Sequence, residues 1–198
     1  MTAPDDDLWR SSATEIAGLT RSKQVSCREV VEAHLRRIEA VDPAVNAVVV
    51  HLDEQSLDAA DAADRLAAHA TELPPLHGVP VTVKESIDLV GTPTTQGARV
   101  LADAYPPTSS PDVERLVRAG AIPIGRTNVA TLAVRWHCES ELWGSTVNPW
   151  NRDRTPGASS GGVSRPPTLR CHSAWSRSRS REVTRSLRRG AACSSSLR

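Results

Sequence analysis

The sequence predicts an α/β fold in which helices cover a sheet, and two observations support this expectation. First, the β-branched run at 79–83 and the apolar run at 121–124 are typical of buried strands. Second, the segment 110–119 between them has a serine at the N-cap, proline at the first helical position and Gly120 just after its end. A strand, a helix and a strand at this spacing indicate a layered α/β architecture.

Two helices are predicted near the amino terminus from capping boxes, in which a serine and a glutamate three residues later satisfy each other's backbone N–H groups. Ser12 pairs with Glu15, and Ser26 pairs with Glu29. The second helix is expected to stop at Pro43. Its apolar stripe consists of Val31, Leu35 and Ile38.

The middle of the chain predicts further elements of both kinds. Residues 45–52 indicate a short strand or a buried connection, and an Ala-rich helix is expected over about 53–70. The residues expected on the inner faces are Leu57, Ala60 and Leu66 in this helix, and Val113, Leu116 and Val117 in the helix that starts at Ser110.

Charge divides the chain into two regions. The formal net charge is +1, but residues 163–198 contain nine Arg, nine Ser, no Lys and one acidic residue, so they carry +8 and residues 1–162 carry −7. The segment 163–198 has no helical or strand period, and such a composition cannot bury enough apolar surface to offset the entropy of ordering. We therefore expect one domain over 1–162 and a tail over 163–198 that is disordered or results from a shifted reading frame.

The cysteines and the hydropathy exclude several classes of protein. Four widely spaced cysteines without a CxxC pair argue against a disulfide framework and a zinc knuckle, so we expect no metal and a reducing, cytoplasmic setting. His137 and Cys138 are adjacent, and adjacent side chains on an extended segment point apart, which disfavours a shared metal. The chain starts without a signal-like segment, and no apolar run is long enough to cross a bilayer, so no membrane partner is expected.

Lys84 is the first candidate catalytic residue. The chain uses Arg 22 times and Lys only twice, and Lys84 directly follows the buried strand 79–83. A guanidinium keeps its proton in proteins, whereas burial can tune an ammonium toward the neutral form that a general base requires. The competing interpretation is a surface lysine beside Glu85.

The segment PGASSGG at 156–162 is the second candidate. Glycines around paired hydroxyls let backbone N–H groups and serine Oγ atoms approach a small anion or a carbonyl oxygen. A flexible turn is the competing interpretation. A phosphate-binding loop is disfavoured, because no GK[ST] ending follows.

Taken together, these elements and their surroundings resemble the amidase signature family. The segments LHGVPVTVKE (76–85), GTPTTQG (91–97), RAGAIPIGRTN (118–128), NPW (148–150) and the Ser-Gly loop match the family's motifs in order and spacing across about 12–162. The resemblance implies the α/β amidase signature fold, a mixed β-sheet covered by helices, incomplete in this chain.

The resemblance also implies an activity, hydrolysis of the C–N bond of a carboxamide by a Ser-Ser-Lys triad. Lys84 corresponds to the base, and Ser159, in a cis peptide, corresponds to the bridging serine that relays the proton between a nucleophilic serine and the lysine. Ser160, Gly161 and Gly162 correspond to substrate-binding positions. No metal or organic cofactor is implied, the expected ligand is a small-molecule amide, and a homodimer is allowed.

The family pattern stops at Gly162. The nucleophile of the family lies about two dozen residues beyond the relay serine, after an aspartate and two glycines, and that distance reaches the vicinity of Val183. The segment 180–186 contains neither glycine nor aspartate, so Ser180 and Ser186 are not assigned as nucleophiles. We therefore expect a truncated, inactive copy with a shifted reading frame after Gly162, and an Asp…Gly-Gly-Ser segment in a neighbouring frame of the coding DNA.

Smaller departures from the family are Arg126 in place of a usual lysine, Thr131 in place of a frequent acidic residue and Ala158 in place of a glycine. Two alternative functions stay open. The chain could resemble the amidotransferase-subunit branch of the family, which works with partner subunits. The Ser-Arg run at 176–181 could contact nucleic acid, but only Trp175 offers an aromatic platform, so nucleic acid is not the expected partner. We also expect low stability, because strands 79–83 and 121–124 would have unpaired edges.

Overall fold

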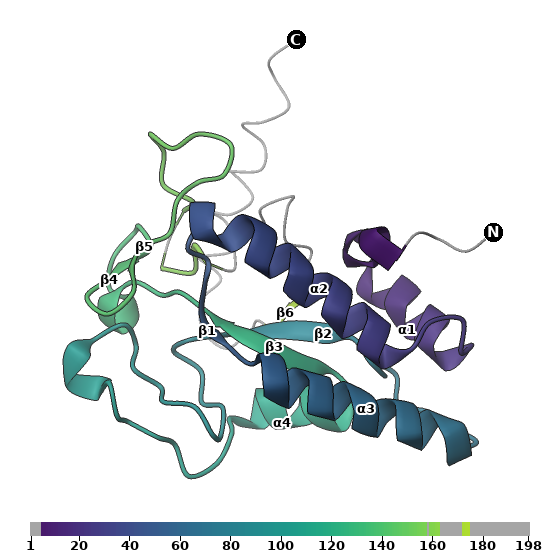
Figure 1. The fold of residues 1–198 in the computed structure, drawn as a ribbon. Coiled ribbons are helices and arrows are strands. Elements are labelled where there is room, and N and C mark those ends of the chain that lie inside the picture. Colours follow the sequence, from purple (N-terminus) through teal and green to yellow (C-terminus); the bar gives the residue numbers. More distant parts are fainter. Residues whose placement is uncertain (1–4, 158, 163–171, 175–198) are drawn as a thin grey trace.

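The computed structural model describes residues 5–157, 159–162 and 172–174 and contains a mixed four-stranded sheet (Figure 1). The strand order is β1-β3-β2-β6, with β1 antiparallel to β3, and β2 parallel to both β3 and β6. The strands are β1 (Val48–His51), β2 (Pro80–Lys84), β3 (Ile122–Thr127) and β6 (His172–Ala174). A separate small hairpin consists of β4 (Glu139–Ser140) and β5 (Gly144–Ser145).

Helices cover this sheet, as the sequence predicts. In Figure 1, α2 lies on one side of the sheet and α4 on the other, while α3 packs against both α2 and β3. The α-helices are α1 (Ala13–Arg21), α2 (Cys27–Val41), α3 (Asp53–His69) and α4 (Pro111–Arg118). Short 3-10 helices are η1 (Asp5–Arg10), η2 (Asp42–Ala44), η3 (Arg99–Leu101) and η4 (Thr131–Ala133). Among the residues just delimited, no helix is both long and apolar enough to cross a bilayer.

Local sequence signals account for most helix boundaries. Both predicted capping boxes are present, with Ser12 and Ser26 each accepting a hydrogen bond from the backbone N–H three residues later. Helix α2 ends two residues before Pro43, and its Val31 and Ile38 are buried in the core with β1 and β3. Gly120 follows α4 with a φ of 94°, a left-handed conformation that favours glycine at this position.

Two predictions for the helices were wrong in detail. Leu66 is 48% exposed, because the buried side of α3 follows Ala60, Ala63 and Ala67 at i, i+3, i+7 spacing and Leu66 lies off that stripe. Val117 is 47% exposed, since the short helix α4 contacts the core through Val113 and Leu116 only. The predicted N-cap Ser110, with a proline directly after it, is confirmed, and the serine side chain makes no capping hydrogen bond.

One strand comes from the segment in which no regular structure was expected. Residues His172–Ala174 form β6, whose register pairs Val81 with His172 and Val83 with Ala174. An open strand edge presents unpaired backbone N–H and C=O groups that any extended segment can pair with, which explains a strand of three residues without a strand-like pattern. This edge of β2 is therefore paired along 81–83. The other predictions for 163–198 concern residues outside the described part of the chain.

Candidate active site

Lys84 is the last residue of β2, a strand whose five residues are all buried. Its relative exposure is 8%, which rules out the competing interpretation of a surface lysine. The neighbouring strand holds the backbone here, because Lys84 pairs with Thr127 in the parallel register and the Glu85 N–H donates to the Thr127 carbonyl at 2.9 Å. The buried strand β2 thus places the Lys84 amine at the carboxyl-terminal end of this strand.

The Ser-Gly loop meets Lys84 through a side-chain contact. Lys84 Nζ donates a hydrogen bond to Ser160 Oγ at 2.8 Å, across 76 positions of the sequence. Burial lowers the pKa of Lys84 below that of an exposed lysine, while electrostatic interaction with Cys138 acts in the opposite direction. The two candidates found separately in the sequence therefore form one local arrangement of an amine and a hydroxyl.

Ser159 lies next to this contact. Its carbonyl accepts a hydrogen bond from the Ala130 N–H at 3.4 Å, which anchors the loop to the segment after β3. The structure thus brings Ser160 into direct contact with Lys84, and the role of Ser159 as proton relay stays a prediction. The peptide bond before Ser159 belongs to Ala158, which lies outside the described residues, so the predicted cis geometry also stays a prediction.

Gly161 and Gly162 are buried, and both are needed for close packing of the loop. A Cβ on Gly161 would lie 2.5 Å from Cys138 Cβ, and a Cβ on Gly162 would lie 2.7 Å from the backbone N of Asn128. No residue with a side chain fits at these distances. These contacts give both glycines a role in seating the loop, and their assignment to substrate binding stays a prediction.

Asn128 organises the backbone around the loop. Its Nδ2 donates to the Gly144 carbonyl at 3.1 Å and to Thr146 Oγ1 at 3.0 Å, and its Oδ1 accepts from Ser140 Oγ at 3.2 Å. One buried amide thereby ties the end of β3 to the β4–β5 hairpin. Since Gly162 packs against Asn128, the same amide also fixes the seat of the Ser-Gly loop.

Comparison with known proteins identifies the family. The family model described as Amidase matches residues 29–165, which is more than half of the chain. The chain belongs to the amidase signature family. The matched span includes Lys84 and the Ser-Gly loop, and the resemblance to the family seen in the sequence is confirmed.

Individual relatives cover the same part of the chain. Indoleacetamide hydrolase of Bradyrhizobium diazoefficiens is 45% identical over 160 residues, which is 81% of this chain and 30% of that protein. The A subunit of the glutamyl-tRNA(Gln) amidotransferase of Salinispora tropica is 45% identical over 159 residues, covering 80% of this chain and 32% of the relative. The chain therefore spans about a third of the length of these relatives.

Solved structures of the family show the same fold. A bacterial aryl acylamidase superposes with a TM-score of 0.74 at 34% identity, over 78% of this chain and 32% of its own. A fatty acid amide hydrolase superposes with a TM-score of 0.76 at 25% identity, over 81% of this chain and 28% of its own. The predicted amidase signature fold is confirmed for the part of the chain that these structures cover.

Two buried charged residues near Lys84 were not assigned a role from the sequence. Glu85 has no exposed surface, and its carboxylate accepts hydrogen bonds from the N–H groups of Thr95 at 2.8 Å and Gly97 at 3.2 Å. Arg126 is also fully buried, and burial lowers its pKa while the carboxylates of Glu85 and Asp88 raise it. The sequence did contain a signal for both residues: Arg126 lies within a largely apolar strand, and Glu85 follows directly after Lys84 at the end of another.

The two described cysteines are free and buried. Burial, together with Asp64, raises the pKa of Cys27 to about 12, so its thiol stays protonated at neutral pH. Cys138 packs against Gly161 in the site. Within 5–157, 159–162 and 172–174, no three metal-ligating side chains come together, and Cys171 and Cys193 lie outside those residues.

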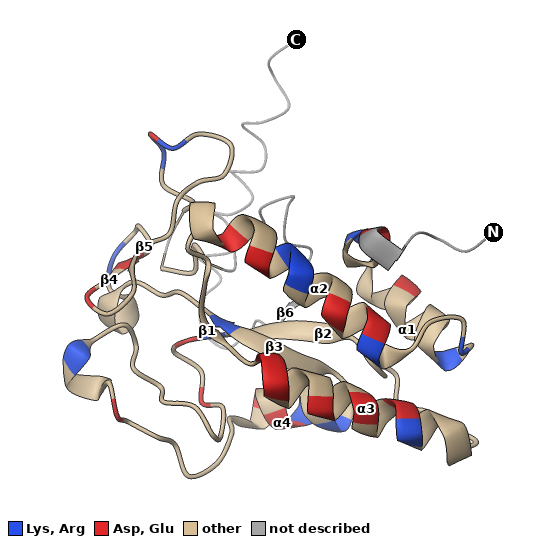
Figure 2. Ribbon diagram, in the orientation of Figure 1, with Lys and Arg blue, Asp and Glu red and all other residues tan. Residues whose placement is uncertain are grey.

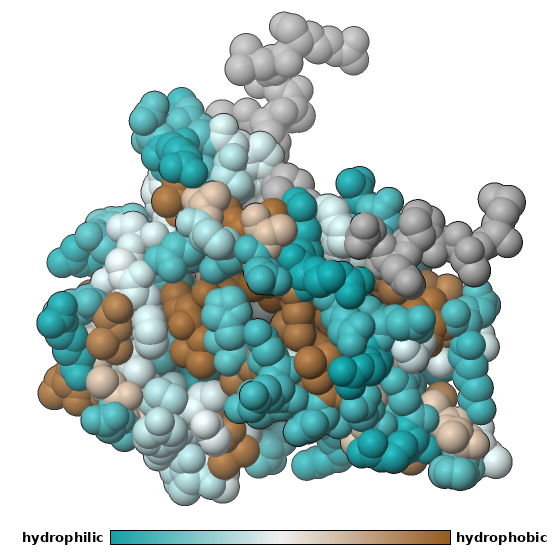
Figure 3. All heavy atoms as spheres, in the orientation of Figure 1, coloured by the Kyte–Doolittle hydropathy of each residue, from teal (hydrophilic) through white to brown (hydrophobic). Residues whose placement is uncertain are grey.

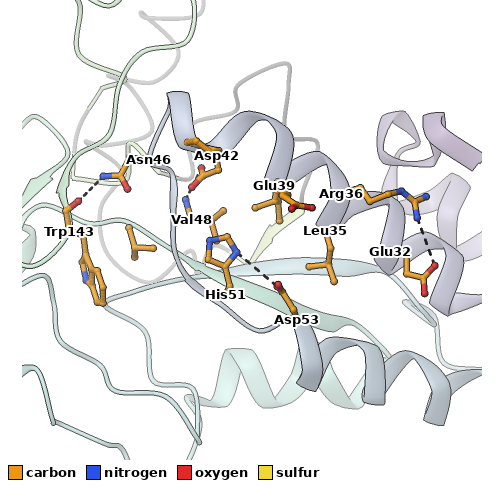
Figure 4. A pocket seen from close by; sticks show the side chains of 13 residues that line it. Glu32, Leu35, Arg36, Glu39, Asp42, Asn46, Val48, His51, Asp53 and Trp143 are labelled. Atoms are coloured by element: carbon orange, nitrogen blue, oxygen red, sulfur yellow. Dashed lines mark hydrogen bonds and ion pairs between the residues drawn. The ribbon is translucent and has the colours of Figure 1, made fainter.

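A groove of about 760 Å³ lies elsewhere, along α2 and β1, and contains neither Lys84 nor Ser160. Figure 3 shows apolar side chains exposed in the middle of this face of the molecule, bordered by polar ones. Figure 4 shows that polar side chains on the groove wall pair with one another, Arg36 with Glu32 at 3.8 Å and His51 with Asp53 at 3.9 Å. The lining comprises Glu32, Leu35, Arg36, Ile38, Glu39, Asp42, Pro43, Asn46, Val48, Val49, His51, Asp53 and Trp143.

Proposed function

We propose that this chain is the base-carrying, amino-terminal part of an amide hydrolase in which neutral Lys84 accepts a proton from a serine hydroxyl. The observation that supports the proposal is the 2.8 Å contact between Lys84 Nζ and Ser160 Oγ in a buried setting. A hydroxyl is a poor nucleophile at its own pKa and needs an adjacent base. A lysine whose pKa is lowered by burial can act as that base at a pH closer to neutrality.

The two serines have different places in this proposal. Ser160 contacts the amine directly. Ser159 is the neighbouring hydroxyl that accepts the proton of a further, nucleophilic serine and passes its own proton toward Lys84, as in the Ser-Ser-Lys arrangement of the family. The substrate class is a small-molecule carboxamide, the class to which the name of the indoleacetamide hydrolase relative also points. Without a nucleophile, the pair can polarise a hydroxyl but cannot form an acyl-enzyme.

We further propose that the chain does not hydrolyse amides, because the segment 180–186 lacks the glycines and the aspartate that accompany the family's nucleophile. The purified chain is incubated with a fluorophosphonate probe, and its intact mass is measured. We expect no adduct, with matched Ser159→Ala and Ser160→Ala variants as controls for labelling in the loop. An adduct on Ser180 or Ser186 would show that a nucleophile is present and overturn this part of the proposal.

The base itself is tested by titration, which the composition makes simple. The chain has only two lysines, Lys23 and Lys84, so protein made with ¹³Cε-labelled lysine gives two signals, assigned with a Lys84→Arg variant. The proposal requires Lys84 to lose its proton well below the ordinary lysine value of about 10.4. A midpoint at or above that value would exclude Lys84 as the base.

A role within an amidotransferase complex is the second candidate. One observation supports this second function: the chain is 45% identical to the A subunit of the glutamyl-tRNA(Gln) amidotransferase, and it is also 45% identical to indoleacetamide hydrolase. This function requires stable association with partner subunits. Co-purification of the tagged chain with separately expressed amidotransferase partner subunits would favour it, and elution of the chain alone would leave the hydrolase origin as the better account.

A further inference from the structure

Arg126 lies on β3 directly beside the end of β2. The parallel register pairs it with Val83, one position before Lys84. Its side chain has no exposed surface, so the chain buries a permanent cation next to the strand that carries the candidate base. A buried charge of this kind is costly unless hydrogen bonds satisfy it.

The two terminal nitrogens of the Arg126 guanidinium donate to oxygens of the segment that follows β2, while its buried Nε has no partner among the described residues. Nη2 donates at 2.6 Å to the Ile87 carbonyl, at 2.9 Å to that of Glu85 and at 3.5 Å to that of Lys84. Nη1 donates at 2.6 Å to Thr92 Oγ1 and at 2.7 Å to the Pro93 carbonyl. One planar group therefore holds both the turn after Lys84 and the return of the loop near 92–93.

The same loop is held from its other side by Glu85. The Glu85 carboxylate accepts from the backbone N–H groups of Thr95 and Gly97, and its charge interacts favourably with Arg126. The backbone from 84 to 97 is thus fixed by two buried, oppositely charged side chains. Lys84 is the first residue of this fixed segment, and its amine makes the contact with Ser160.

We propose that Arg126 is a positioning residue for Lys84, holding the backbone at 84–87 so that the amine stays in contact with Ser160. The inference rests on the proposed role of Lys84 as a base and adds a residue that acts through it. A guanidinium suits this task for two reasons. Its planar fork reaches several carbonyls at once, whereas an ammonium has three N–H donors on a single nitrogen. It also keeps its proton, so Lys84 is the member of this pair of buried cations that can titrate.

The test uses the ¹³Cε-lysine titration on the full 198-residue chain with Arg126→Met and Arg126→Lys variants. In Arg126→Met, release of the backbone at 84–87 gives water greater access to the amine and favours the ammonium, so the Lys84 midpoint should rise toward that of an exposed lysine. Arg126→Lys, which keeps the charge but has fewer donors, should give a smaller rise. The signal of the exposed Lys23 should be the same in all proteins, and the far-UV circular dichroism spectrum shows that the variants remain folded.

The outcomes separate this inference from the proposed function. An ordinary Lys84 midpoint in the unmodified chain would defeat the proposed function. A low midpoint there that is unchanged in folded Arg126→Met would leave the base in place and overturn the positioning role. If Arg126→Met does not fold, Arg126→Lys decides, since a Lys84 midpoint and linewidth identical to those of the unmodified chain would equally overturn it.

Discussion

The groove along α2 and the carboxyl-terminal end of β2 both gather ionisable side chains, but they expose them to water very differently. In the groove, Arg36 and Glu32 lie 3.8 Å apart, and the side chains of both are at least one third exposed. At the end of β2, Lys84 is 8% exposed, and Glu85 and Arg126 are fully buried. Figure 2 shows charged residues along both α2 and α3, with acidic and basic residues mixed on α2 and mainly acidic residues on α3.

This difference shows why the groove along α2 is not the better candidate site. Exposed ion pairs are screened by water and contribute little, so a pair such as Arg36 with Glu32 gives little evidence of a site. Buried ionisable groups are costly and are tolerated where hydrogen bonds or function offset the cost. The catalytic chemistry of this chain is therefore expected at the buried carboxyl-terminal end of β2. Four predictions test this difference between the groove and the end of β2.

The largest effect is expected for Glu85→Ala. This variant leaves the buried Arg126 charge without its nearest opposite charge and frees two backbone N–H groups, so the free energy of unfolding should fall by about 3–5 kcal/mol. The matched variant in the groove is Glu39→Ala, an exposed carboxylate whose removal should cost less than about 0.5 kcal/mol. Urea unfolding compares the two, and similar losses would erase the distinction between the regions.

Gly162→Ala should follow in size. The new Cβ would lie 2.7 Å from Asn128 N and 2.9 Å from the Ala47 carbonyl, both of them backbone atoms that cannot move aside cheaply. We expect a loss of about 1–3 kcal/mol together with loss of the Lys84–Ser160 contact. Gly18→Ala in α1, where a Cβ meets nothing within 4 Å, is the control and should gain about 0.5–1 kcal/mol. A neutral Gly162→Ala would mean that the loop is not seated as described.

Lys84→Met should change the pH dependence of stability. The folded-state pKa of Lys84 is lowered by burial, so below it the folded chain carries a buried ammonium at a cost, and the cost disappears as the pH rises toward the unfolded value of about 10.4. The variant should therefore be more stable near neutral pH, by an amount on the order of 1 kcal/mol, or about 2–4 °C in Tm. The advantage should shrink as the pH rises through that window. An advantage that is constant with pH would show that Lys84 titrates alike in the folded and unfolded chain.

The smallest effect separates the adjacent serines. Ser160→Ala removes the acceptor of the 2.8 Å hydrogen bond and should shift the ¹³Cε resonance of Lys84, while Ser159→Ala should shift it less. Neither variant should alter the Lys23 resonance. A larger shift for Ser159→Ala would assign the direct contact to Ser159.

How much the sequence predicts differs between local and distant features. The capping boxes at Ser12 and Ser26, the stop before Pro43 and the left-handed Gly120 depend on neighbours within a few residues, and all four were predicted. The exposure of Leu66 and Val117 was not, because how wide a stripe of a helix is buried depends on what packs against it.

The sequence by itself determined the α/β fold, the family and the two elements of the candidate site, because strand patterns, caps and glycine-rich motifs are short and local. Only the tertiary structure decided that Ser160 is the serine against Lys84, 76 positions away, and that Arg126 and Glu85 enclose the same backbone. The physical reason is that such contacts depend on strand register and on loop packing between distant segments. A buried charge acquires its role only when its hydrogen-bonding partners are in place.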